Sequence, residues 1–209
     1  MVKDDPRDLS TMTYSDNQFR HKVVFYGTLP SIWGVSMGLR FSGIAGTRYS
    51  LAVQGNVNGD FVNSNDLAYV FDPNNTSVPE NLRKGISEIL ENPKAEQSIK
   101  DYINNNKGRI AERNGGVNGF YGVFDLHLAK EVRLFGIHKV EGSIDFFNLA
   151  NMFNKNWGVG NNLGKQNLYS IKSFDAAKQE YVYNMSSNVG VSNLNGNPFQ
   201  IQLGLRYAF

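Results

Sequence analysis

The chain has 209 residues, enough for a domain with a hydrophobic core, and a formal net charge of +2. Its lysines and arginines are not massed in any segment, which argues against a nucleic-acid partner. The absence of cysteine excludes disulfide bonds and thiolate metal sites. No apolar run approaches the ~18 residues of a membrane-spanning helix, so a membrane would have to be crossed by β-strands.

The N-terminal third begins with a polar, aperiodic segment, residues 1–18, which predicts a loop. Residues 19–28 alternate weakly and predict a strand, and Leu29-Pro30-Ser31 predicts a turn. Residues 31–43 alternate clearly. One face carries Trp33, Val35, Met37, Leu39 and Phe41, and the other carries Gly34, Ser36, Gly38, Arg40 and Ser42.

The next segment, residues 44–118, changes character along its length. Residues 49–54 alternate as a strand, and an Asn/Asp-rich stretch follows at 56–66. Ser77 and Glu80 have the spacing of a capping box. Apolar residues then recur at helical spacing, which predicts two short helices within 76–106, separated at Asn92-Pro93.

The C-terminal half returns to β-structure. Residues 119–132 and 137–151 alternate as strands joined by a turn at 133–136, and residues 168–174 and 181–185 predict a hairpin within a long connection. The final strand covers 198–209. Its apolar face carries Phe199, Ile201, Leu203, Leu205, Tyr207 and Phe209.

These strands combine bulky apolar side chains on one face with small or polar ones on the other, an arrangement typical of strands between lipid and a watery lumen. We therefore predict an all-β fold, an antiparallel transmembrane β-barrel portion of about five strands. Barrels have short periplasmic turns and long extracellular loops, so the connections 44–118 and 150–197 are predicted to be extracellular.

The interface residues of this predicted barrel are aromatic. Trp33, Tyr207 and Phe209 are expected at the periplasmic interface, and Phe41, Phe120 and Tyr121 at the outer one. Since the smallest barrels have about 8 strands, five cannot close one. The chain also begins without a signal peptide, so we expect it to be a piece of a longer exported protein.

Four segments resemble the C-terminal end of TonB-dependent outer-membrane receptors, most closely the Oar-like group with a carboxypeptidase-regulatory-like domain that is common in Bacteroidetes. They are GIAGTRYSLAVQGNVNGDFVNSNDLAYVFDP at 43–73, GRIAERNGG at 108–116, IDFFNLANMFNKNWG at 144–158 and FQIQLGLRYAF at 199–209. An asparagine-leucine pair after a strand, a tryptophan-glycine pair and a terminal aromatic residue follow in the order of that family.

The resemblance implies a Gram-negative outer-membrane location, in a barrel of about 22 strands closed by an N-terminal plug. This chain would supply residues 19–209 as the C-terminal part of that barrel, in contact with outer-membrane lipid. Energy-coupled transport of an unknown substrate, and contact with the TonB complex, would belong to the full-length protein. Leu205, Tyr207 and Phe209 would form the signal read by the barrel-assembly machinery.

A calcium site is one interpretation of Asn56, Asn58, Asp60 and Asp66, whose oxygens recur as in a calcium-binding loop. Phe61 occupies the place of the turn glycine, and Asp66 falls one position before the acidic twelfth residue. The other interpretation is an Asn/Asp/Gly-rich turn held by its own side-chain hydrogen bonds. Ca²⁺ is the one cofactor that the sequence suggests.

Charged residues are expected inside the lumen. They are Arg40, Asp125, Glu141, Asp145 and Arg206. Pairing of opposite charges across neighbouring strands is the favoured interpretation, and contact with substrate or plug is the alternative. The sequence Gly34-x-Ser36-x-Gly38 has the spacing of a hydrolase nucleophile elbow, but the strand pattern runs through Ser36, so no catalytic residue is assigned and no enzyme is predicted.

Two other functions remain open. The first is a soluble, calcium-assisted, β-rich binding module whose apolar faces are buried between two sheets. The second is a small self-closing outer-membrane barrel that acts as an adhesin or a pore. Dependence on detergent would separate a membrane protein from the first, and a heat-modifiable gel shift would identify the second.

Overall fold

The structure, a computed structural model, describes residues 12–209, apart from the side chains of residues 193–195. The chain forms two compact units. Unit 1 comprises residues up to Gln18, Thr47–Asn118 and Asn162–Asn193, and unit 2 comprises Phe19–Gly46, Gly119–Asn161 and Leu194–Phe209. Within residues 12–209, the helices are all too short or too polar to cross a membrane.

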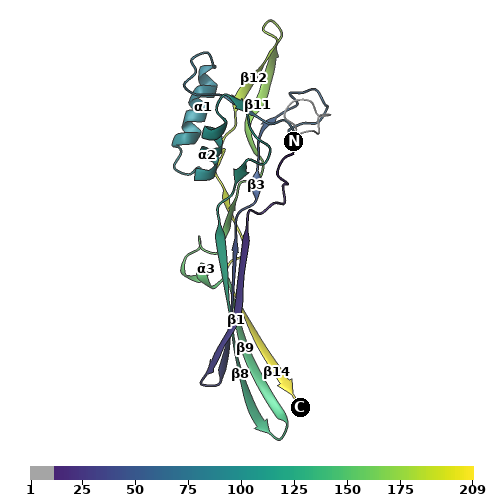
Figure 1. Ribbon diagram of the computed structural model, residues 1–209, viewed down its shortest axis with the longest axis vertical. Coiled ribbons are helices and arrows are strands. Elements are labelled where there is room, and N and C mark those ends of the chain that lie inside the picture. Colours follow the sequence, from purple (N-terminus) through teal and green to yellow (C-terminus); the bar gives the residue numbers. More distant parts are fainter. Residues whose placement is uncertain (1–11) are drawn as a thin grey trace. The chain divides into compact units, whose positions relative to one another are not determined.

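Unit 2 is built on one five-stranded sheet. Its strands are β1 (Lys22–Ile32), β2 (Val35–Ile44), β8 (Tyr121–Phe135), β9 (His138–Phe147) and β14 (Gln200–Ala208). Every neighbouring pair is antiparallel, in the order β1-β2-β8-β9-β14 (Figure 1). All five predicted strands are therefore present. The sheet is open, with β1 and β14 at its edges.

Both hairpin turns of this sheet lie further along the chain than predicted. Strand β1 continues through Pro30, and the chain reverses at Trp33-Gly34, where φ is 52° and 75°. Two positive φ angles are the requirement of a tight type I′ hairpin. Pro30 is tolerated because β1 is an edge strand, whose free side needs no N–H donor. Trp33 therefore lies in a turn rather than on a strand face.

The second predicted turn, at 133–136, is also placed too early. Strand β8 extends to Phe135, and Gly136 supplies the positive φ of 56° that the reversal needs. Both turns and the C-terminus lie at the same end of the sheet (Figure 1). The two long connections leave the sheet from its opposite end.

Unit 1 contains the remaining predicted elements and several short strands. They are β3 (Arg48–Tyr49), β4 (Leu51–Gln54), β5 (Tyr69–Val70), α1 (Glu80–Glu91), α2 (Gln97–Asn106), β6 (Arg109–Ile110), β7 (Gly116–Val117), β11 (Gln166–Asp175) and β12 (Glu180–Met185). Outside this set lie α3 (Leu149–Phe153) and the paired strands β10 (Gly160–Asn162) and β13 (Asn193–Asn195).

The central sheet of unit 1 joins distant parts of the sequence. The predicted hairpin is confirmed as β11 and β12, and β11 also pairs in parallel with β4. The single strand predicted at 49–54 is divided at Ser50, because β3 pairs with β7 whereas β4 pairs with β11. Long-range pairing of this kind leaves no local signal in the sequence.

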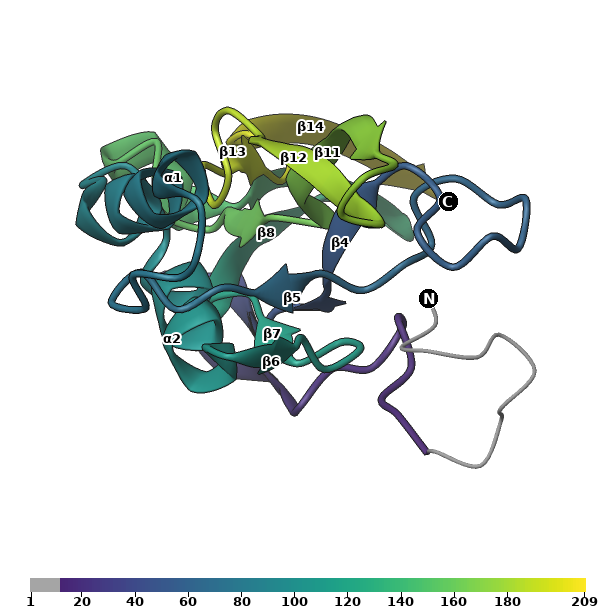
Figure 2. The same ribbon diagram turned by 90° about the horizontal axis from the view of Figure 1, so that it is seen from above.

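The two helices follow their predicted apolar spacing. Helix α1 buries Leu82, Ile86 and Ile89, and helix α2 buries Ile99, Tyr102 and Ile103. Figure 2 shows the two helices on one side of unit 1. The predicted capping box is wrong, since Pro79 is the N-cap of α1 and makes no side-chain cap. Ser77 instead donates its backbone N–H to Asn75 Oδ1, 3.0 Å away, in a local turn.

The two long connections share one hydrophobic core. Buried side chains come from both segments, including Leu51, Ile86 and Ile99 from the first and Leu168 and Tyr169 from the second. At ~1.5–3 kcal/mol for each fully buried large apolar side chain, this core supplies the main stabilisation of unit 1.

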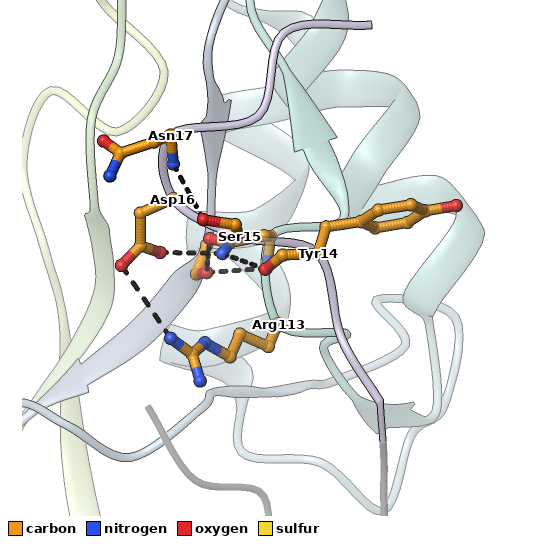
Figure 3. A network of polar contacts seen from close by, with 7 residues as sticks. Tyr14, Ser15, Asp16, Asn17 and Arg113 are labelled. Carbon is orange, nitrogen blue, oxygen red and sulfur yellow. Dashed lines mark hydrogen bonds and ion pairs between the residues drawn. The ribbon is translucent and has the colours of Figure 1, made fainter.

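A polar network attaches the described part of the N-terminal segment to the rest of unit 1 (Figure 3). The buried Asn114 amide donates to the Tyr14 carbonyl and to Asp16 Oδ1, both at 2.7 Å. Asn114 Oδ1 accepts a hydrogen bond from Ser50 Oγ at 2.9 Å. Arg48 lies over the Tyr14 ring. The predicted loop 1–18 is thus held in place over residues 12–18, and residues 1–11 lie outside the described part.

Replacement of Gly116 by alanine should destabilise unit 1 by about 1–3 kcal/mol, the typical cost of overpacking. A Cβ atom on Gly116 would lie 2.4 Å from Tyr49 Cζ, and the Tyr49 ring is buried and cannot move aside. Faster hydrogen exchange of the β3 and β4 amides would report the loss. Gly119→Ala is the control because its Cβ would meet no atom within 4 Å. Equal effects of the two changes would contradict this packing.

Candidate functional site

The sheet of unit 2 presents a largely apolar face, on which Lys130 lies in the row of Val35, Gly142 and Leu205. Direct cross-strand partners share a face, and one row runs through all five strands from Leu29 through Met37, Leu128 and Ile144 to Leu203. The Leu203 residue is 74% exposed and its neighbour Leu205 is 82% exposed. Large apolar side chains on the edge strands are therefore exposed, and those on the central strands, such as Met37 and Leu128, are half-buried, which is an unusual amount of apolar surface for a sheet in water.

The five predicted lumen residues share the opposite face. The register places Arg40 beside Asp125 and Glu141 beside Arg206, in each case as direct cross-strand partners. Asp145 is the direct cross-strand partner of His127 on one side and of Gln202 on the other. The sheet thus collects charges of both signs on one face.

The observed polar contacts differ from simple pairing of the predicted charges. Asp145 Oδ1 lies 2.6 Å from His127 Nδ1. Asp125 accepts a hydrogen bond at 2.9 Å from the backbone N–H of Asn148. The partner of Asp145 is therefore His127, which is not one of the five predicted charged residues. The sequence shows that His127 and Asp125, two positions apart on one strand, share a face. It does not show the register that brings Asp145 beside His127.

A shallow depression of about 450 Å³ lies among these groups. Arg40, Asp125, His127 and Asp145 line it, together with Tyr26. Its chemistry is that of a polar surface with hydrogen-bond donors and acceptors of both charges. Such a surface can contact a polar solute or another part of a protein.

The asparagine-leucine and tryptophan-glycine pairs quoted for the family resemblance lie together in unit 2. Asn148 ends β9 in the left-handed conformation, with φ 53°, and donates from Nδ2 to the Gly158 carbonyl at 3.1 Å. Asn151 Nδ2 donates to the Trp157 carbonyl at 3.0 Å. These bonds hold α3 and the chain after it against the end of β9. The two pairs therefore build a structural turn.

The predicted assembly-signal residues lie on the edge strand β14 and just beyond it. Leu205, Tyr207 and Phe209 are all exposed. The Tyr207 hydroxyl is 2.5 Å from His138 Nδ1, and the two rings stack with centroids 5.8 Å apart. An aromatic cluster therefore marks the end of the sheet that carries the hairpin turns.

The candidate calcium loop is held by its own side chains. Asn56 Oδ1 accepts the Gly59 N–H at 2.8 Å, and Asp66 Oδ2 accepts the Val57 N–H at 2.6 Å. Asn58 Oδ1 accepts the Asp60 N–H at 3.0 Å. These are the bonds expected of an Asn/Asp/Gly-rich turn. Residues 12–209 hold no cluster of three or more Asp, Glu, His or Cys side chains placed to bind a metal.

Of the remaining motif, Gly34-x-Ser36-x-Gly38, Ser36 and Gly38 lie in a strand as predicted, whereas Gly34 does not. Gly34 belongs to the hairpin turn, and β2 continues through Ser36 to Ile44. The Ser36 hydroxyl donates to the Ala129 carbonyl at 3.2 Å. The serine is thus part of the sheet, without the strand-to-helix turn that a nucleophile elbow requires.

No known protein family, curated protein or solved structure matches this chain. Inferences about its function therefore depend on the geometry described above and on the motif resemblance.

The hydrogen bonds of the 56–66 loop predict a measurable pKa change. The pKa of Asp60 is held below the ordinary 3.8, first by the Asn65 side-chain amide and then by the Val62 N–H. Because the folded loop favours the carboxylate, this stabilisation is present above the ordinary pKa and is lost as pH falls through the lower folded-state value. Asn65→Ala should raise the Asp60 pKa, as measured by carbon-detected NMR titration.

The matched control is Asn63→Ala, another asparagine in the same exposed loop that is not a cause of the Asp60 shift. An Asp60 pKa that is the same in the Asn65→Ala variant and in the unmodified chain would contradict the network.

Proposed function

We propose that the chain forms the C-terminal part of the wall of a TonB-dependent-receptor-type barrel in the outer membrane of a Gram-negative bacterium. The apolar face of the five-stranded sheet then contacts lipid, and the face with Arg40 and Asp145 lines the lumen. The hairpin turns are periplasmic. Unit 1, formed by the two long connections, is the extracellular part.

The observation that carries this proposal is the uncovered apolar face. Removing a large apolar side chain from water is worth ~1.5–3 kcal/mol, so a face of this size is a large penalty for a protein in aqueous solution. Contact with hydrocarbon removes the penalty. The strands have 11, 10, 15, 10 and 9 residues. These lengths meet the ~9–11 residues that a tilted strand needs to cross a bilayer.

Aromatic residues at the two ends of the sheet also support a sheet that spans a membrane. Tyr207, Phe209 and Phe135 gather near the turns. At the other end, Phe41 stacks on Phe25, and Phe120 stacks on His21. Two groups of rings separated by an aliphatic band are typical of the aromatic girdles of membrane barrels.

The open sheet edges fit a part of a larger wall. The outer sides of β1 and β14 have no neighbouring strand in the described sheet, and lipid offers no hydrogen-bond partners to a backbone edge. Further strands of a full-length protein would pair with these edges. In this proposal the plug, the TonB contact and the energy coupling lie in that remainder, and the charged lumen face contributes to the path of a polar substrate.

The two other candidate functions have less support. A soluble binding module would need a second layer over Leu203 and Leu205, which are the most exposed apolar residues of β14. A self-closing barrel would need β1 to pair with β14 or with further strands, and the described sheet has five strands with two free edges.

Spin labels at two adjacent residues test the proposal. The chain lacks cysteine, so Leu203→Cys and Gln202→Cys each give a single labelling site on opposite faces of β14. In phospholipid vesicles, we expect the label at 203 to be more accessible to oxygen, which concentrates in hydrocarbon, and the label at 202 to a water-soluble nickel complex. Electron paramagnetic resonance power saturation measures both accessibilities.

Equal accessibility at the two sites, or a chain that stays monomeric and folded without detergent or lipid, would refute the membrane assignment. The DNA upstream of Met1 provides a separate test of the receptor assignment. An open reading frame that continues upstream into a plug domain is the expected result.

A further inference from the structure

The largely apolar face of the unit 2 sheet carries one permanent charge. Among the residues that the register places on this face of the five described strands, Lys130 is the single lysine, arginine, aspartate or glutamate. Its direct cross-strand partners are Val35 and Gly142. Lys130 is exposed, and its ammonium group makes no hydrogen bond or ion pair with any residue that the structure describes. In a membrane, this cation needs an acceptor from outside the chain.

The Lys130 side chain extends toward the β1–β2 turn. A Cβ atom built on Gly34 would lie 3.9 Å from Lys130 Cε. Gly34 belongs to that turn and directly precedes Val35, the cross-strand partner of Lys130. The end of the lysine side chain therefore lies beside the turn. A lysine next to hydrocarbon adopts this direction when its stem stays on apolar groups and its ammonium reaches the membrane surface.

Aromatic residues mark the level of Lys130 along the sheet. Trp33, which is 92% exposed, lies in the turn next to Gly34. Tyr207 lies in the row of Val140 and Val132, and Val132 is two residues from Lys130 on β8. Tryptophan and tyrosine are enriched where a membrane meets water. A charge on the lipid face is costly at the bilayer centre and nearly free at that interface, so the headgroup region is the level at which Lys130 is tolerated.

The sheet leaves room beside the lysine. Gly142 follows Lys130 in its row, and Leu205 follows Gly142. A Cβ atom on Gly142 would meet no atom within 4 Å, so this position of the face is open. A glycine inside a strand often marks a place where a ligand approaches the backbone closely. A headgroup can therefore reach the Lys130 ammonium from the Gly142 side, with its acyl chains against Leu205.

We propose that Lys130 binds the phosphate group of a phospholipid in the leaflet at the turn end of the sheet. The inference rests on the membrane position proposed above. An ammonium group has three N–H donors and no acceptor, and a phosphate supplies charged acceptors. Anionic phospholipids should bind more tightly than zwitterionic ones, since a lysine near the membrane surface is attracted by net negative charge. Inorganic phosphate has the same acceptors, but it lacks acyl chains to lie on the apolar side chains around Lys130.

The fluorescence of Trp33 can measure this preference. The chain has two tryptophans, so Trp157→Phe leaves Trp33 as the reporter beside the lysine. The full chain is placed in phosphatidylcholine vesicles that contain either phosphatidylglycerol or phosphatidylcholine with acyl chains brominated close to the headgroup, because bromine quenches a nearby indole. The quenching should show an apparent preference for phosphatidylglycerol of about fivefold, as expected for one lysine near an anionic membrane surface.

Three variants in this background locate the preference. Lys130→Met keeps an unbranched apolar stem and removes the charge, so it should abolish the preference, whereas a role in packing alone would leave the preference unchanged. Lys130→Arg should retain it, since charge and donors remain. Lys22→Met is the matched control, because Lys22 is an exposed lysine of β1 that shares the face of Tyr26 and Arg40. Its preference should equal that of the chain with both lysines.

The outcomes separate this inference from the membrane assignment. Equal quenching by the two lipids, or a preference that survives Lys130→Met, would overturn the lipid site and leave the membrane assignment standing. Quenching by neither lipid would refute both. Loss of the preference on addition of inorganic phosphate at constant ionic strength would show that the site takes free phosphate, which overturns the assignment to a lipid.

Discussion

The hydrogen-bonded register of the five-stranded sheet is the constraint on which unit 2 depends. Side chains on a strand alternate between faces, and antiparallel register joins like faces across strands. The row from Leu29 to Leu203 is apolar at every position, and the next row carries His127, Asp145 and Gln202. A slip of one residue in any strand would exchange the two faces of that strand. The separation of apolar and polar surfaces therefore requires all four pairings at once.

Unit 1 depends on a different principle. Its segments are too short and too polar to be stable alone, and they gain a core only by packing together. The parallel pairing of β11 with β4 joins Leu168 to Leu51 through one buried layer, and the two helices close that layer with Ile86 and Ile99. The result is a compact unit inserted within the connections of a sheet.

Buried asparagines connect these elements in both units. Asn114 and Asn118 in unit 1, and Asn148 in unit 2, are at most 5% exposed and hydrogen-bond to backbone groups from distant segments. An amide offers two donors and an acceptor, so it can satisfy irregular backbone where regular pairing is absent. The high asparagine content thus has a structural role in a protein with long irregular connections. The side-chain oxygens of Asn148 and Asn106 are both buried and accept no hydrogen bond from the residues that the structure describes.

The sequence by itself determined the five strands, their two faces and the two helices, because alternation and helical spacing are local patterns that burial imposes directly. It also placed Arg40, Asp125 and Asp145 on one face. The turn at Trp33-Gly34 was missed because Pro30 is a common turn residue, and only the edge position of β1 explains its tolerance within a strand.

Only the tertiary structure decided which residues meet. Contact between His127 and Asp145 requires the register of β8 and β9, and the shared core of unit 1 requires a parallel pairing between segments more than 100 residues apart. Neither leaves a local pattern, since the partners are brought together by the free energy of the whole fold.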